Sequence, residues 1–193
     1  MRIAPAEFHQ HDFRVHTFLP DVPLHDVWRF ALVGGGGERT IRDVAALLQN
    51  GAIEQANVTV RGLFTLRGAL GRVFGWDNAQ HAIPEASYVN RLTEADRARS
   101  LDEPGSQQGA FRVIYTFPQE TLGEIQNATV HAFSLMAMTP TPEGYRVFWA
   151  IYVKRVSWLT PCYMACIDPF RRFLVYPTVI KRLQQAWRIA YPA

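Results

Sequence analysis

Two carboxylates and a histidine, Glu120, Glu124 and His131, follow one another in a strand-like stretch of the chain. On a continuous strand Asn127 would project from the same face as His131, because side chains alternate between the two faces. A histidine on an apolar face with a carboxylate nearby can orient a ligand or act as a general acid or base. The pattern therefore makes His131 a candidate for proton transfer, with Glu124 or Glu120 as its partner. The alternative is a histidine whose hydrogen bonds are satisfied within the core.

Aromatic side chains are frequent around this stretch and are suited either to line a pocket for a flat or acyl ligand or to fill the core. Arg171 and Arg172 follow Asp168 and suit the binding of a carboxylate or phosphate, with ion pairing along a helix face as the common alternative. We expect the ligand-binding residues to be Tyr115, Asn127, His131, Phe133, Trp149, Tyr152, Arg172 and Phe173.

Other patterns that suggest nucleotides or metals lack the remaining parts of such sites. No lysine of a phosphate-binding loop follows the four glycines Gly34–Gly37, so a flexible linker is the better interpretation. The three histidines between residues 9 and 16 have no further ligand at a diagnostic spacing. Cys162 and Cys166 are poorly placed for a disulfide and too few for a zinc site, so we expect buried free thiols. We therefore predict no metal and no cofactor.

The composition bounds the class of protein. The chain has 193 residues, of which 48% are hydrophobic and 12% aromatic, enough for one domain with a substantial core. We expect a single domain over residues 1–193, with residues 1–11 as a mobile tail. No long apolar run and no signal peptide is evident, which favours a cytoplasmic location without a membrane span.

The positive charge is concentrated toward the C-terminus. The formal net charge is +3, and from Lys154 onward seven basic residues accompany a single acid, Asp168. This asymmetry suits a solvated helix face, an acidic ligand or the anionic surface of a membrane. Nucleic acid is not an expected partner, because no nucleic-acid motif is present. Peripheral membrane contact stays open, and the sequence does not determine the oligomeric state.

The hydrophobic periodicity predicts an alternation of strands and helices. Helical spacing is expected after Pro23, through Val27 and Trp28, and the last strand, apolar on both faces, should be central. The other expected elements are a strand over 13–19, helices over 41–48, 60–74 and 94–100, an extended piece over 87–92, and strands over 111–117, 120–138 (broken near Gly123 or Asn127) and 145–156, the last two joined as a hairpin.

The C-terminal region contains two helix starts of the same type. Thr160-Pro161 and Asp168-Pro169 each place an N-cap residue before a proline at the first helical position. We therefore expect a short helix, then a long amphipathic helix from Asp168. Its apolar stripe should consist of Phe173, Tyr176, Ile180, Leu183 and Trp187.

This order of elements leads to a resemblance. The runs SYVNRLTEADRARSLDEPG, NATVHAF, WAIYVKRVS and YMACIDPFRRFLVYP resemble those of an uncharacterised bacterial protein family of the START-like (SRPBCC) superfamily. The likeness covers Leu66 to Trp187, and the PFRR run from Pro169 to Arg172 is its most specific piece. The resemblance implies an α+β helix-grip fold, in which a curved antiparallel sheet wraps around a long C-terminal helix and encloses an apolar cavity. It implies no particular activity, since the superfamily includes lipid carriers, hormone receptors, cyclases and ring-hydroxylase subunits.

Three functions are therefore compatible with the sequence. The first is non-covalent binding of a small hydrophobic or amphipathic molecule in an internal cavity. The second is a cyclase-like or other enzyme that uses His131 for proton transfer. The third is an interaction module that docks its basic C-terminal helix on a membrane surface or a protein partner.

Overall fold

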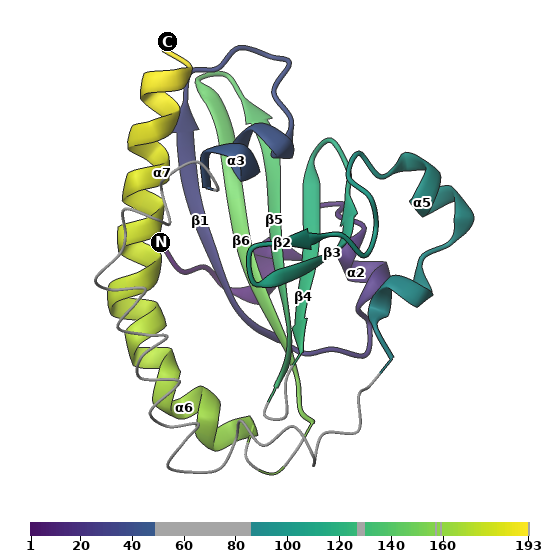
Figure 1. The fold of residues 1–193 in the computed structure, drawn as a ribbon. Coiled ribbons are helices and arrows are strands. Elements are labelled where there is room, and N and C mark those ends of the chain that lie inside the picture. Colours follow the sequence, from purple (N-terminus) through teal and green to yellow (C-terminus); the bar gives the residue numbers. More distant parts are fainter. Residues whose placement is uncertain (49–85, 127–129, 157, 159, 193) are drawn as a thin grey trace.

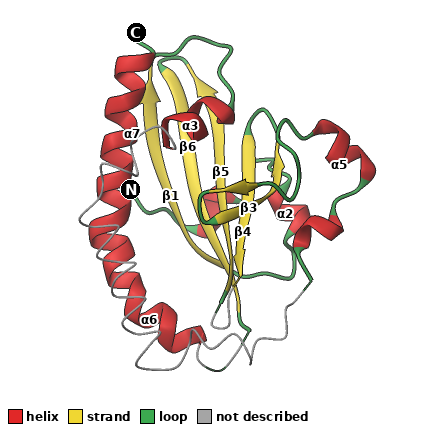
Figure 2. Cartoon of the chain, viewed as in Figure 1, coloured by secondary structure: helices red, strands yellow, loops and turns green. Residues whose placement is uncertain are grey.

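A six-stranded antiparallel sheet packs against one long C-terminal helix, so the fold is α+β, as the sequence predicts (Figures 1 and 2). The computed structural model describes residues 1–48, 86–126, 130–156, 158 and 160–192. The strands lie in the order β1-β6-β5-β4-β3-β2. Their bounds are β1 Leu24–Val33, β2 Gln107–Gln108, β3 Phe111–Thr116, β4 Glu120–Gln126, β5 His131–Thr141 and β6 Gly144–Lys154. The helices that precede the C-terminal one are α1 Pro5–Phe8, α2 Val15–Phe18, α3 Ile41–Leu47, η3 Tyr88–Arg91 and α5 Glu94–Arg99.

The C-terminal helix continues without a break over 31 residues. It consists of α6 (Thr160–Phe170), a π-helical segment η4 (Arg171–Val175) and α7 (Tyr176–Ala190). The second helix start expected at Asp168 is therefore wrong. Asp168 lies inside α6, and its carboxylate binds side chains instead of the backbone N–H groups of a new first turn.

The central strand β6 is covered on both faces, as its apolar side chains predict. Val147 and Trp149 belong to a hydrophobic cluster with α3 and α7. Phe148 and Tyr152 belong to a second cluster, which includes residues of α1 and α2. The sheet therefore separates two cores, and a side chain's position along the strand decides which of them it enters.

The helix α7 buries most of the expected apolar stripe. Tyr176, Ile180, Leu183 and Trp187 lie in the cluster against the sheet, and burying each such side chain stabilises the fold by about 2 to 3 kcal/mol. Phe173 was expected in the same stripe, but 79% of its surface is exposed. It lies in the π-helical segment, where the wider turn changes the direction in which side chains project.

The first residues of the chain pack on the sheet instead of forming the expected mobile tail. The backbone N–H of Arg29 donates to the Met1 carbonyl at 2.8 Å, and that of Ile3 donates to the Val27 carbonyl at 3.1 Å. These bonds cover the outer edge of β1, which would otherwise expose unpaired backbone groups. Phe8 is fully buried. Such long-range pairing leaves no local pattern in the sequence.

Two expectations in the N-terminal half are wrong. The segment expected as a strand over residues 13–19 contains the short helix α2, and the segment expected as a helix after Pro23 is β1. The apolar residues of β1 occur at both helical and strand spacings, so periodicity alone does not distinguish a helix from a strand in this segment. Nine residues of β1 pair with β6, and this tertiary pairing determines that the segment forms a strand.

Most other elements agree with the sequence. The expected helices over 41–48 and 94–100 are confirmed by α3 and α5, and the strands from residue 111 onward by β3 to β6. The piece expected as extended over 87–92 is the 3-10 helix η3, and the helix expected over 60–74 lies outside the described residues. Cys162 and Cys166 are free, but they are exposed, not buried. Within the described part of the chain, no helix is long and apolar enough to span a membrane.

Gly144 begins β6 in a backbone conformation that other residues adopt only at a cost. Its φ is +141°, and an added Cβ would lie 2.2 Å from the carbonyl oxygen of Leu32. We predict that Gly144→Ala lowers the free energy of unfolding by more than about 2 kcal/mol, measured by urea denaturation. Gly105 has a φ of +93° but no atom within 4 Å of its added Cβ, so Gly105→Ala should cost only about 1 kcal/mol. Equal losses would contradict the steric explanation.

Candidate functional site

His131 and Glu124 form the hydrogen-bonded pair that the sequence suggested, but the pair is enclosed. The side chains are 0% and 2% exposed, and His131 Nε2 lies 3.0 Å from Glu124 Oε2. Glu124 also accepts hydrogen bonds from the Ser87 hydroxyl and from the Tyr88 backbone N–H. Burial would raise the pKa of Glu124, but these hydrogen bonds outweigh it and lower the pKa. The pair thus holds η3 on the sheet. Neither His131 nor Glu124 lines either of the two clefts described below.

Glu120 lies in the same core, away from His131. Its Oε1 accepts a hydrogen bond of 2.7 Å from the Arg14 backbone N–H, and burial raises its pKa to about 7. Among the described residues, its Oε2 and the hydroxyls of Tyr115 and Tyr152 have no hydrogen-bond partner. Burial also raises the pKa of both tyrosines, so their hydroxyls are protonated at neutral pH.

The residues expected to bind a ligand are divided between the two faces of the sheet. Tyr115, Phe133 and Tyr152 lie in the core beneath α1 and α2. Trp149 lies on the other face, where its Nε1 donates to the Ser134 hydroxyl at 3.0 Å and its ring contacts Tyr176. Positions 149 and 152 are an odd number of residues apart, so they cannot share a face of one regular strand.

The remaining candidates are on or near the helix. Arg172 pairs with Asp168 at 3.2 Å, Phe173 is exposed, and Asn127 lies outside the described residues. The candidates therefore do not line one common cavity, and their part in binding stays a prediction.

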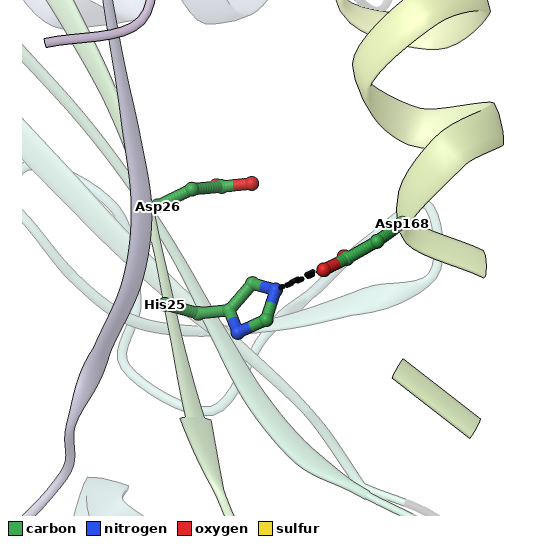
Figure 3. A group of neighbouring side chains, drawn as sticks. All are labelled: His25, Asp26 and Asp168. Atoms are coloured by element: carbon green, nitrogen blue, oxygen red, sulfur yellow. Dashed lines mark hydrogen bonds and ion pairs between the residues drawn. The ribbon is translucent and has the colours of Figure 1, made fainter. Parts of the chain in front are cut away.

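A different polar cluster forms where β1 faces the helix. Between Leu24, which pairs with Tyr152, and Asp26, which pairs with Ile151, β1 contains one extra residue, His25. This β-bulge re-aims the strand, as bulges do. Consecutive side chains of a regular strand point to opposite faces, but here both His25 and Asp26 project toward Asp168 on the helix (Figure 3).

The helix contributes its part of the cluster at a second irregularity. Asp168 is in the last turn of α6, Arg171 begins the π-helical segment, and Tyr176 follows it. The wider turn brings residues five apart together, and the Arg171 guanidinium donates a hydrogen bond to the Tyr176 hydroxyl. Single-turn π segments are frequent at functional sites.

Arg171 connects the two carboxylates of the cluster. Its Nη1 lies 2.9 Å from Asp168 Oδ1, and its Nη2 lies 3.5 Å from Asp26 Oδ1. The Tyr176 hydroxyl donates to the same Asp26 oxygen at 3.3 Å, and burial raises the pKa of this tyrosine. His25 Nε2 lies 2.7 Å from Asp168 Oδ2. The cluster thus joins β1 to the helix by charge-assisted hydrogen bonds.

A cleft of about 480 Å³ opens beside this cluster, within the size range of small-molecule sites. His25 and Asp168 form part of its polar lining, together with Arg155 and Thr160. Its apolar lining comprises Pro23, Leu24, Val153, Pro161, Met164 and Ala165. A smaller cleft of about 320 Å³ is lined by His9, His16 and Tyr152 among others, and Leu24 lines both clefts.

His25, Asp26 and Asp168 also have donor atoms suited to a divalent cation. One donor atom of each residue lies within 4.8 Å of the others. However, the Arg171 guanidinium already pairs with both carboxylates, and a metal ion would have to displace this positive charge. The arrangement is therefore better suited to holding a histidine in place than to binding a metal.

The sequence alone did not reveal His25 and Asp26 as site residues. A helix was expected at this point, and a β-bulge has no sequence signature of its own. The available signal was weak: an adjacent histidine and aspartate at the start of an apolar run, and a distant aspartate followed by two arginines. Only the second part, Asp168 with Arg171 and Arg172, is a candidate from the sequence, and the structure places it in the cluster.

Comparison with known proteins gives a family but no activity. A family model described as "Protein of unknown function (DUF2867)" matches residues 18–178, which is most of the chain. No protein with a curated description matches.

The raised pKa of Glu120 generates a prediction for stability. Above the ordinary pKa of a glutamate, the unfolded chain releases a proton that folded Glu120 keeps until about pH 7, so stability falls as pH rises through this window. From pH 5 to pH 8 the wild type should lose about 2 to 3 kcal/mol relative to Glu120→Gln, measured by urea denaturation at each pH. Glu124→Gln should not remove this loss between pH 5 and pH 8, because the pKa of Glu124 is lowered and its contribution changes only below the ordinary pKa of a glutamate. A wild type and Glu120→Gln that lose stability in parallel would refute the assignment.

The ion pair between Arg171 and Asp26 generates a second prediction. Each is largely buried, so Arg171→Met should destabilise the protein by about 3 kcal/mol, because the charge of Asp26 loses its compensation. Asp26→Asn should cost less, about 2 kcal/mol, because Arg171 keeps its ion pair with Asp168. The double variant should recover about 2 kcal/mol of the summed loss in a double-mutant cycle. The exposed pair Arg91 and Asp21 is the matched control, with a coupling below about 1 kcal/mol. Additive losses at Arg171 and Asp26 would show that the pair is not coupled.

Proposed function

We propose, for a chain that belongs to the DUF2867 family of proteins of unknown function, that it binds a small amphipathic molecule in the cleft between β1, β6 and α6. The observation that carries this proposal is the composition of the cleft wall. One part is apolar, with Leu24, Val153 and Met164, and another part presents the His25–Asp168 pair. Such a wall suits a ligand with an apolar body and a polar end.

The fold supports this proposal. An antiparallel sheet packed on a long C-terminal helix is consistent with the START-like superfamily that the sequence resembles, where ligands are held between sheet and helix. In this proposal the ligand lies at one end of that interface, beside α6. The roles expected for His131 and Glu124 as a catalytic pair receive no support, because the pair is enclosed. The cytoplasmic location and contact with an anionic membrane surface remain predictions.

Ala165 offers a way to block the cleft without disturbing the core, because it lines the cleft and is exposed. We predict that the wild type binds the amphipathic probe anilinonaphthalene sulfonate and that Ala165→Trp weakens this binding at least about tenfold, since the indole fills space in the cleft. Fluorescence titration measures the affinity.

Ala98→Trp is the matched control, because Ala98 is an exposed position of α5 outside the cleft lining. It should bind the probe as the wild type does. Native mass spectrometry of the protein from its own host, compared with the denatured mass, adds a test for a resident ligand. Unchanged probe binding by Ala165→Trp would show that this cleft is not the binding site.

A further inference from the structure

We propose that His25 is a general base that removes a proton from the molecule bound in the cleft, and that Asp168 is the residue that positions it. This inference rests on the proposed function, because it requires a ligand beside His25. It assigns a catalytic role to a histidine other than His131. The substrate class is an amphipathic molecule with a weakly acidic C–H bond next to an electron-withdrawing group.

The first argument is the orientation of the imidazole. Its Nε2 lies 2.7 Å from one oxygen of Asp168 and 3.0 Å from the other. Asp168 is itself paired with Arg171 and Arg172, so it is a carboxylate that accepts and Nε2 must donate. In the neutral imidazole this leaves the lone pair on Nδ1. Among the described residues, none forms a hydrogen bond with Nδ1 of His25.

The second argument is access. The side chain of His25 is 24% exposed and lines the larger cleft. A base must come within hydrogen-bonding distance of the proton it removes, and only a group at the cleft surface meets this condition. His131 has a similar carboxylate partner, but it is 0% exposed. The two pairs differ in access and not in the types of residue.

The third argument is the backbone that supports His25. A regular β1 would direct His25 and Asp26 to opposite faces, and the bulge directs both toward the helix. The π-helical segment brings Arg171 to both Asp26 and Asp168. The carboxylate that orients the imidazole is therefore itself fixed by two partly buried ion pairs, as preorganised sites require.

The proposed step needs no additional reactant. The C–H proton moves to Nδ1 of His25, the electron pair of that bond remains on the substrate as an anion, and the imidazolium then returns the proton to the same or another position. The cleft lining includes Arg155, whose positive charge stabilises the anion that forms on the substrate.

Nitrobenzisoxazole tests this step, because its ring opens when any base removes its one acidic C–H proton. The C–H electron pair forms the nitrile, the N–O bond breaks, and the phenolate oxygen keeps the released pair, which gives a coloured product. We expect the wild type to accelerate this reaction over buffer and His25→Gln to reduce kcat/KM by about a hundredfold. His9→Gln, in the smaller cleft, is the matched control and should keep the wild-type rate.

The positioning role of Asp168 has its own readout. Nitrogen NMR of the histidine rings should show that His25 carries its proton on Nε2 in the wild type, and Asp168→Asn should change that distribution, because an amide can also donate to Nε2. Titration of His25→Gln with anilinonaphthalene sulfonate reports on the cleft separately. Retained probe binding with an unchanged reaction rate would overturn the catalytic role and leave the binding function intact. Loss of probe binding in Ala165→Trp without loss of the wild-type reaction would place the base outside this cleft.

Discussion

The ion pairs of the buried Arg171 guanidinium are the interactions on which the packing of the helix against the sheet depends. The guanidinium lies between a carboxylate from the sheet, Asp26, and one from the helix, Asp168. Charges removed from water are costly unless each is paired, so the buried carboxylate of Asp26 depends on the guanidinium, whereas Asp168 also pairs with Arg172 and His25. The same contact fixes the place of the helix along β1 and holds the partner of His25. The contacts that attach the helix to β1 are therefore the same contacts that build the site.

Two departures from regular secondary structure make this contact possible. A bulge at His25 turns two consecutive side chains of β1 to one face, and a π-helical segment between α6 and α7 brings Arg171 to the Tyr176 hydroxyl. Each interrupts a hydrogen-bond ladder and is retained only where the surroundings compensate for the loss. Here the compensation is the polar cluster itself. The proposed ligand cleft opens beside it and is lined in part by His25 and Asp168.

The comparison of the two histidine–carboxylate pairs shows how burial separates structure from chemistry. His131 and Glu124 are shielded from solvent by Tyr88 and Phe133, whose rings contact the imidazole, and the pair holds η3 on the sheet. His25 has the same kind of partner but borders a cleft. A histidine–carboxylate pair can take part in acid–base chemistry only where another molecule can reach it.

The sequence by itself determined the features that depend on local pattern. The apolar faces of β6, the hairpin before it and the buried stripe of Tyr176, Ile180, Leu183 and Trp187 followed from periodicity, and with them the α+β class. Only the tertiary structure decided that β1 is a strand, since its pairing with β6 outweighs an ambiguous local pattern. It also decided which histidine reaches a cleft. His25 and Asp168 are 143 residues apart, and their contact depends on a bulge and a π-helical segment that arise from packing and have no local signature.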